Sequence, residues 1–173
     1  MKLLSAIRNT RSGFTLIELL LYVVLSGIIL SAVAYLSIML LESRIRNQAV
    51  SEVEQQGLYA VEIIADAIRN SEGVNSPAQG GTATSLSLNV FNAANDPTIF
   101  DVATGTLRMT EGATAAVPLT SGRVIASGLR IDNLSKTATP GTIRVEFTLN
   151  HLNAVGRPEY EYGRTFSAAA SRR

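Results

Sequence analysis

The residues with the clearest potential for chemistry lie near the start of the chain. Gly13 is followed by Phe14, and Glu18 comes four residues later, just before a run without charges from Leu19 to Leu41. An ordinary secretory signal has its cleavage site after its apolar region, which processing removes. Here the one plausible cut after a small residue, between Gly13 and Phe14, precedes the apolar region. Cleavage at this bond would leave a free amine on Phe14 and would keep the apolar segment in the mature protein.

The apolar run predicts a helix that crosses a membrane once. Its roughly 23 residues would extend about 35 Å as an α-helix with a rise of about 1.5 Å per residue. The hydrocarbon core of a bilayer is about 30 Å thick. Lys2, Arg8 and Arg11 precede the run, and no second apolar run of this length follows it. Because positively charged flanks tend to stay on the cytoplasmic side, we expect the N-terminus in the cytoplasm and the bulk of the chain outside it.

Glu18 is unusual because it lies at the edge of an apolar helix. A carboxylate carried to the centre of a bilayer costs about 2.5–3.5 kcal/mol, and less at the interface. Two interpretations are open. The first is that Glu18 lies in the first helical turns, where the helix dipole favours a negative charge and headgroup water reaches it. The second is that Glu18 pairs with a free amine at Phe14, either its own or that of a neighbouring subunit.

Residues Arg11–Leu19, with the sequence RSGFTLIEL, closely resemble the cleavage and methylation signal of type IV prepilins and pseudopilins. The resemblance implies that a prepilin peptidase cuts after Gly13 and methylates Phe14, and that Glu18 pairs with a neighbouring subunit during filament assembly. The implied partners are other pilin or pseudopilin subunits, the peptidase, an inner-membrane assembly platform and membrane lipid. The implied location is the cytoplasmic (inner) membrane, with the C-terminal head outside the cytoplasm, and then a periplasmic or surface filament.

Further features indicate a subclass. Residues Glu54–Ala60 and Ile64–Asn70 are similar to the helix end of the J-type minor pseudopilin of type II secretion and of the W-type minor pilin of type IV pili. The chain has no cysteine, whereas many main pilus subunits close a C-terminal loop with a disulfide. The first proline is Pro77, whereas main pilins often have one inside the N-terminal helix. These departures favour a minor pilin or a pseudopilin.

The chain is expected to divide into a leader at 1–13, a transmembrane and assembly helix at 14–41, an amphipathic helix at 42–72 and a β-rich pilin head at 73–173. The helix should continue to about Asn70, with Gly73 as a stop signal and a loop over Ser71–Gly81. Gly57 falls on the apolar stripe, and we expect it to allow a close approach to the sheet, with a kink as the alternative. The stripe recurs at helical spacing and consists of Ile45, Ala49, Val53, Ala60, Ile64 and Ile68.

Beyond Gly81 the apolar residues alternate, which is typical of strands. The alternation is clearest at Thr142–Asn150 and also occurs at Leu86–Val90 and Thr106–Thr110, while Tyr160, Tyr162 and Phe166 indicate another strand near the end. One helix followed by several short strands predicts an α+β fold. In this pilin-like arrangement the amphipathic half of the helix packs on a C-terminal antiparallel sheet. Turn-forming clusters are expected between the strands at Asn92–Pro97, Glu111–Ala115, Asp132–Gly141 and Asn153–Pro158.

Composition argues against several functions. The leader holds three of the fifteen basic residues, so the mature chain would have twelve basic against fourteen acidic residues, which gives no support to a broad DNA-binding surface. The single histidine, His151, is predicted to be an ordinary loop residue. The acids that could in principle bind calcium lack the spacing of a calcium loop and are expected to form turns; they are Asp96, Asp101, Glu111 and Asp132. We expect no enzymatic activity, no metal and no cofactor.

The leading hypothesis is therefore a structural one, a minor pilin or pseudopilin. The alternative is a tip-located subunit that binds DNA, a surface or a secreted substrate. That alternative would require dispersed arginines to converge on the folded head; the candidates are Arg123, Arg130, Arg144, Arg157 and Arg164. An anchored enzyme has no supporting motif, because no phosphate loop, nucleophile turn or catalytic carboxylate pair is recognisable.

Overall fold

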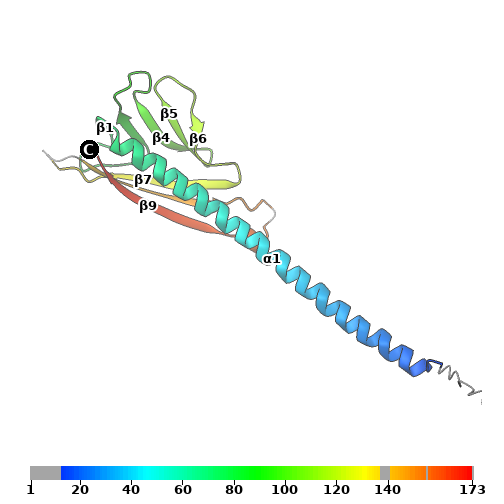
Figure 1. Ribbon diagram of the computed structural model, residues 1–173. Coiled ribbons are helices and arrows are strands. Elements are labelled where there is room, and N and C mark those ends of the chain that lie inside the picture. The colour runs from blue at the N-terminus through cyan, green and yellow to red at the C-terminus, as the bar shows by residue number, and fades with distance from the viewer. Residues whose placement is uncertain (1–12, 137–140, 155, 173) are drawn as a thin grey trace, which may run out of the picture. The chain divides into compact units, whose positions relative to one another are not determined.

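The computed structural model describes residues 13–136, 141–154 and 156–172, and contains one long helix followed by short antiparallel strands (Figure 1). The chain divides into two units, residues 1–41 and residues 42–173, and each is described by itself. The predicted α+β class is confirmed. The elements are α1 (Leu16–Arg69), β1 (Gly73–Ser76), β2 (Thr82–Ala83), β3 (Leu86–Asn89), β4 (Thr98–Ala103), β5 (Thr106–Glu111), β6 (Val117–Pro118), β7 (Val124–Asn133), β8 (Thr142–His151), the 3₁₀ turn η1 (Pro158–Tyr160) and β9 (Gly163–Ser171).

The second half of α1 carries the predicted apolar stripe. The predicted members are buried except Ile45, which is half-buried, and Ala65 joins them. The predicted end near Asn70 is confirmed, because α1 stops at Arg69. Gly57 is buried on the stripe, and a Cβ atom added to it would overlap the ring of Phe166 on β9. The close approach expected at this glycine is therefore present.

The strands form two antiparallel sheets, where one was predicted. The five-stranded sheet has the order β1-β3-β4-β5-β6, and the four-stranded sheet has the order β2-β7-β8-β9. The strand predicted at Thr142–Asn150 is β8, and its alternation is reproduced in full by the buried side chains Ile143, Val145, Phe147 and Leu149.

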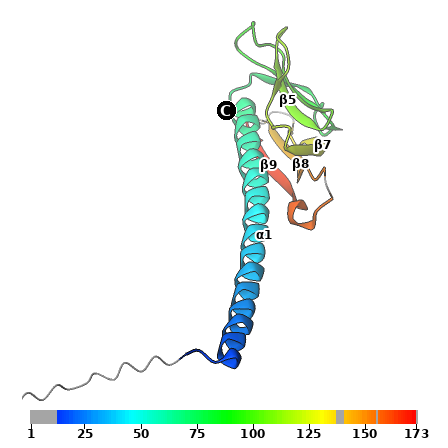
Figure 2. The same ribbon diagram turned by 90° about the vertical axis from the view of Figure 1, so that its right-hand side faces the viewer.

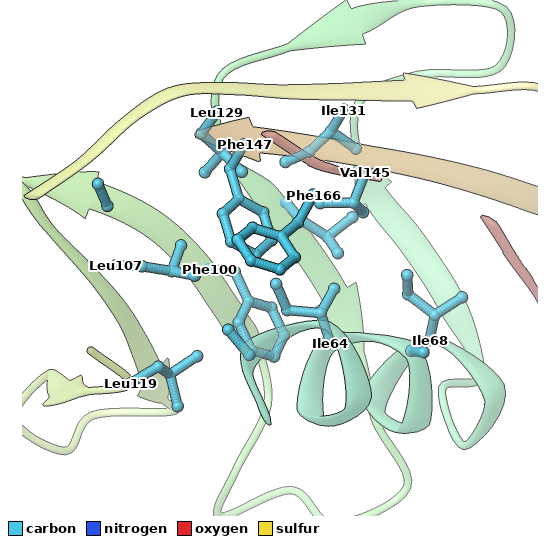
Figure 3. Packing of buried hydrophobic residues seen from close by; sticks show 14 of the residues in the cluster. Ile64, Ile68, Phe100, Leu107, Leu119, Leu129, Ile131, Val145, Phe147 and Phe166 are labelled. Carbon is cyan, nitrogen blue, oxygen red and sulfur yellow. The ribbon is translucent and has the colours of Figure 1, made fainter. Parts of the chain in front are cut away.

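One hydrophobic core joins the stripe of α1 to both sheets. Figure 3 shows Ile64 of the helix beside Phe100 and Phe166, with Ile68 further along the helix and turned toward the sheet. The rings of Phe147 and Phe166 stack with their centroids 5.7 Å apart. Because buried aromatic side chains dominate the energetics of such cores, these rings fix the position of residues 42–69 on the sheets. Figure 2 shows β7, β8 and β9 beside this part of the helix.

Several sequence predictions are wrong in detail. Residues Ser71–Gly81 are not all loop, because β1 pairs with β3. Tyr160 lies in η1 and not in the last strand. Asp132 belongs to β7 and is opposite Arg144 of β8, so the turn predicted at Asp132–Gly141 begins later. Residues 137–140 of that predicted turn lie outside the described part of the chain. β4 and β7 were not predicted. β7 contains a register shift between Ser127 and Arg130, which breaks the alternation expected of a strand.

Candidate assembly and membrane segment

The first turn of α1 is capped by Thr15. The Thr15 hydroxyl oxygen accepts a hydrogen bond from the backbone N–H of Glu18 at 3.4 Å, and the Thr15 carbonyl accepts from Leu19 at 3.2 Å. A threonine in this position satisfies a backbone donor that has no partner inside the helix. Glu18 therefore lies in the first helical turn, where the helix dipole favours a negative charge.

Gly13, Phe14 and Glu18 are all exposed, Phe14 by 72%. The centroid of the Phe14 ring lies 6.0 Å from that of the Tyr22 ring, eight residues further along the chain. Within the described residues Glu18 makes no ion pair. The cationic amine that would complement it exists only after cleavage, because in the uncut chain the nitrogen of Phe14 belongs to a peptide bond. The leader residues Lys2, Arg8 and Arg11 lie outside the described part.

Residues 16–41 of α1 are exposed on every face. Large apolar side chains line the helix all round, and contiguous exposed apolar surface of this extent marks a site that meets lipid or other protein. By length and composition, α1 is the one helix among the described residues that is able to cross a membrane. The segment is thus suited to a membrane anchor, as the sequence indicates.

The serine hydroxyls inside the apolar segment are satisfied by the helix itself. The hydroxyl of Ser26 donates to the carbonyl of Tyr22 at 2.7 Å, and that of Ser31 donates to the carbonyl of Gly27 at 2.7 Å. Ser37 bonds to the carbonyl of Val33 at 2.9 Å in the same way. Because an unpaired polar group is costly in hydrocarbon, these bonds let serines occur in a helix that faces lipid.

The stretch Glu54–Gly57, part of the second family resemblance, connects α1 to the head through three different contacts. Glu54 accepts hydrogen bonds from the hydroxyl of Tyr162, at 2.7 Å, and from the guanidinium of Arg164 on β9. Gln56 exchanges two hydrogen bonds with Ser121, both at 2.8 Å. The third contact is the approach of Gly57 to Phe166.

The electrostatics of the Glu54 cluster are those of a stabilised carboxylate. The hydrogen bond from Arg164, followed by that from Tyr162, lowers the pKa of Glu54. The same bond to Glu54 raises the pKa of Tyr162. Arg164 also lies over the Phe166 ring at 5.5 Å from its centroid. Sequence reasoning missed the partners Tyr162, Arg164 and Ser121, because nothing in their local pattern indicates which helix residue they contact.

The five arginines of the tip-binding alternative do not form an open basic patch. Arg123 lies 3.8 Å from a carboxylate oxygen of Glu52, and Arg130 lies 3.1 Å from one of Asp132. Arg164 is engaged by Glu54, and Arg144 is opposite Asp132 in the β7–β8 register. Within the described residues, neither Arg144 nor Arg157 forms an ion pair. The side chains that would have to attract phosphate are thus largely neutralised by neighbouring acids.

His151 is not a loop residue, contrary to the prediction, because it ends β8. Its Nε2 atom lies 3.7 Å from a carboxylate oxygen of Glu52, its ring stacks on Tyr160 at 5.6 Å, and its buried Nδ1 atom has no hydrogen-bond partner in the described structure. The pattern failed here because strand β8 extends one residue further than its apolar alternation.

The four acids considered for calcium do not gather, and the described residues contain no group of three or more acidic, histidine or cysteine side chains that could hold a metal. Asp101 forms an ion pair with Arg108 at 2.7 Å, which lowers the pKa of Asp101. Asp132 bonds to Thr82 and Arg130. Asp96 accepts a hydrogen bond from the backbone of Val90 at 3.3 Å. Asp96 fits the turn-forming role expected of it, whereas Asp101 and Asp132 lie in β4 and β7 and Glu111 is the last residue of β5.

Comparison with known proteins bears on the N-terminal segment. Residues 8–34 match the model of the prokaryotic N-terminal methylation motif, a range that contains Gly13, Phe14 and Glu18. Neither the curated proteins nor the solved structures that were searched contain a match to the chain. The motif and the exposed apolar helix together support a protein of the type IV pilin or pseudopilin kind, with an N-terminal segment consistent with membrane anchoring and with assembly among pilin subunits.

Proposed function

We propose that this chain is a minor pilin or pseudopilin, a non-enzymatic structural subunit of a filament like that of type IV pili or type II secretion. One observation carries the proposal: a helix exposed on every face over residues 16–41 directly follows the methylation-motif residues Gly13 and Phe14. Such a helix needs apolar surroundings. Lipid supplies them before assembly, and neighbouring helices supply them in a filament.

The proposed sequence of events starts in the cytoplasmic membrane, with the head outside the cytoplasm. A prepilin peptidase cuts after Gly13 and methylates the new amine of Phe14. An assembly platform in the inner membrane then transfers the helix from lipid into the filament, driven by an ATPase that this chain does not supply. Glu18 pairs with the Phe14 amine of a neighbouring subunit, which removes the cost of an uncompensated charge among apolar helices.

We further propose that the subunit is of the J-type minor pseudopilin or W-type minor pilin kind. The support is the similarity at Glu54–Ala60. Three residues of this stretch, Glu54, Gln56 and Gly57, make contacts with the strands and loops of the head. A role in docking the helix would account for their presence in a common motif.

The test is Glu18→Ala in cells that assemble the filament, with Glu42→Ala as the matched control beyond the apolar segment. We expect Glu18→Ala to be cut and inserted like the parent but to be largely missing from purified filaments, whereas Glu42→Ala is incorporated. Mass spectrometry of the parent should give a chain that starts at N-methylated Phe14. Normal incorporation of Glu18→Ala would reject the role of Glu18. A native product that is soluble and starts well beyond Leu41 would reject the whole proposal.

A further inference from the structure

Phe91 is the most exposed of the large apolar side chains described in the head, at 81%, and Leu58 follows it at 60%. Phe91 lies just after β3, in the loop that leads to β4. A single apolar residue on a surface is common and carries little meaning, whereas a contiguous apolar surface marks a site of interaction. The surroundings of Phe91 therefore decide what it indicates.

The loop of Phe91, residues 90–97, contacts a second loop, residues 112–116. The N–H of Gly112 donates to the carbonyl of Pro97 at 3.0 Å, and a Cβ atom added to Gly112 would overlap the carbonyl of Ala94. The two loops therefore form one surface, called the two-loop surface below. Besides Phe91, its exposed apolar residues are Ala93, Ala94, Ala113, Ala115 and Ala116.

The polar groups of the first loop hold its backbone in place. A carboxylate oxygen of Asp96 accepts a hydrogen bond from the N–H of Val90 at 3.3 Å. The side-chain carbonyl of Asn92 accepts one from the N–H of Ala94 at 3.1 Å. Ordering a loop on binding costs free energy, and a loop that is already held avoids part of that cost. Phe91 is thus presented in a way that suits an anchor for a partner.

The two-loop surface lies at the end of the head where α1 stops. Glu72 follows the end of the helix at Arg69, and its N–H donates to the carbonyl of Asn89 at 2.8 Å. Asn89 ends β3, and Phe91 comes directly after it. Within the head, α1 runs from residue 42 to Arg69, so the two-loop surface is remote from the end at which the helix enters the head.

The charges of the two-loop surface are acidic. Its loops contain Asp96 and no lysine or arginine, and Glu111 directly precedes the second loop. Arg172 lies at the same end of the head, where its guanidinium donates to the carbonyl of Glu72. Attachment to an anionic lipid surface depends on lysine and arginine beside the apolar residues, so the composition of these loops favours a protein partner over a lipid one.

A second copy of this chain does not complement the two-loop surface. A cavity that holds a benzene ring has a volume of about 150 Å³, whereas the apolar crevice between α1 and β9 has only about 10 Å³. A larger depression of about 370 Å³ is lined mainly by polar side chains such as Asn150 and Glu161. If the surface packed on its own copy in a two-fold dimer, the acids Asp96 and Glu111 would approach those of the other copy, which is unfavourable.

We propose that the two-loop surface docks the head of a different pilin-type subunit, one that has an apolar pocket for the Phe91 ring and basic residues around that pocket. The inference rests on the proposed function, which supplies the class of partner. The ring is the anchor, the alanines allow a close approach, and Asp96 and Glu111 attract the basic residues. Aromatic anchors that fill a pocket contribute much of the binding energy of an interface.

The first experiment identifies the partner with the full chain in cells that assemble the filament. Phe91→p-benzoylphenylalanine places a photoreactive ring on the surface, and we expect a light-dependent adduct with another subunit that carries the methylation motif. Ile125→p-benzoylphenylalanine is the matched control, because Ile125 is exposed by 42% and lies beside Gly105, at the other end of β4 and β5. The control should not form this adduct.

The second experiment measures binding of the subunit found in the adduct, once purified, to the full chain in detergent micelles. Phe91→Ser should weaken binding at least about tenfold, and Phe91→Leu less. Both variants should unfold like the parent, because Phe91 is exposed. Asp96→Asn keeps an acceptor for the N–H of Val90 but removes the charge. It should weaken binding and make it less sensitive to salt.

The effect of Asp96→Asn also separates the two kinds of partner, because removing the charge would strengthen pairing between two copies. An adduct of the Phe91 variant with a second copy, with lipid or with a protein that lacks the methylation motif would overturn the proposal. Equal binding by Phe91→Ser and the parent would do so too. A chain that is absent from filaments would reject the proposed function as well, whereas a chain that is present in them without an adduct at position 91 rejects this inference alone.

Discussion

The two halves of α1 share one secondary structure and differ in where their apolar residues lie. In residues 16–41 large apolar side chains occur on every face, and all of them are exposed. In residues 42–69 the apolar residues recur on one stripe, and that stripe is buried against the sheets. A helix that is apolar all round needs apolar surroundings on all sides, whereas a helix with one apolar stripe needs a single packing surface.

The two glycines of α1 make the same distinction. At Gly27 an added Cβ atom would meet nothing within 4 Å, whereas at Gly57 it would overlap the Phe166 ring. The same residue type is thus free of contacts in one half of the helix and required by packing in the other. The surface of the first half is therefore open to neighbours such as lipid or other helices, whereas the buried side of the second half has no room for an added side-chain atom at Gly57.

The largest effect is expected from a charge in the first half. Leu30→Arg places a guanidinium near the middle of the apolar run, which disfavours membrane insertion by about 2.5–3.5 kcal/mol. Cell fractionation should show a substantial loss from the membrane relative to Leu30→Val, while the thermal unfolding of the head in detergent should not change. Full membrane retention of Leu30→Arg would contradict the assignment of this segment to lipid.

A smaller effect is expected from Gly57→Ala, with Gly27→Ala as the matched control. Overpacking of a core costs about 1–3 kcal/mol of stability, whereas replacing glycine by alanine inside a helix stabilises the helix by about 1 kcal/mol. Because Phe166 is itself buried between the helix and Phe147, we expect an overpacking cost in the upper part of this range, about 2–3 kcal/mol, and therefore a net loss of about 1–2 kcal/mol in the unfolding free energy of the head. Gly27→Ala should leave that free energy unchanged. Denaturant titrations followed by near-ultraviolet circular dichroism would measure both, and equal values would show that Gly57 is not needed for packing.

The smallest effect concerns the ion pair of the second half. The pKa of Glu54 is lowered from its ordinary value of 4.5 in the folded head, so the stabilisation from Arg164 and Tyr162 is present above that value. It is lost as the pH falls through the lowered pKa. Glu54→Gln should therefore be less stable than the parent at neutral pH, and the difference should shrink below pH 4.5.

Glu62→Gln is the control for this comparison, because Glu62 is exposed on the same helix and has no ion pair within the described part of the chain. Its unfolding profile should follow that of the parent at every pH. A Glu54→Gln profile parallel to the parent from neutral to acid pH would show that the cluster does not contribute through its charge.

The sequence by itself determined the features that depend on neighbours along the chain. Apolar spacing at three and four residues predicted the buried stripe of α1, and alternation predicted β8, because both periods follow directly from backbone geometry. The order of leader, Gly13, Phe14, Glu18 and apolar run predicted the N-terminal segment that the methylation motif matches at residues 8–34. These signals are local, so no knowledge of the folded head was needed to find them.

Only the tertiary structure decided how distant residues meet. It separated the strands into two sheets, assigned Glu54 to partners more than a hundred positions away, and placed His151 against Glu52. It also placed β9 at the edge of its sheet. The physical reason is that strand order and side-chain partners are selected by burial over the whole core, and the same alternating pattern is compatible with an edge strand or a central one.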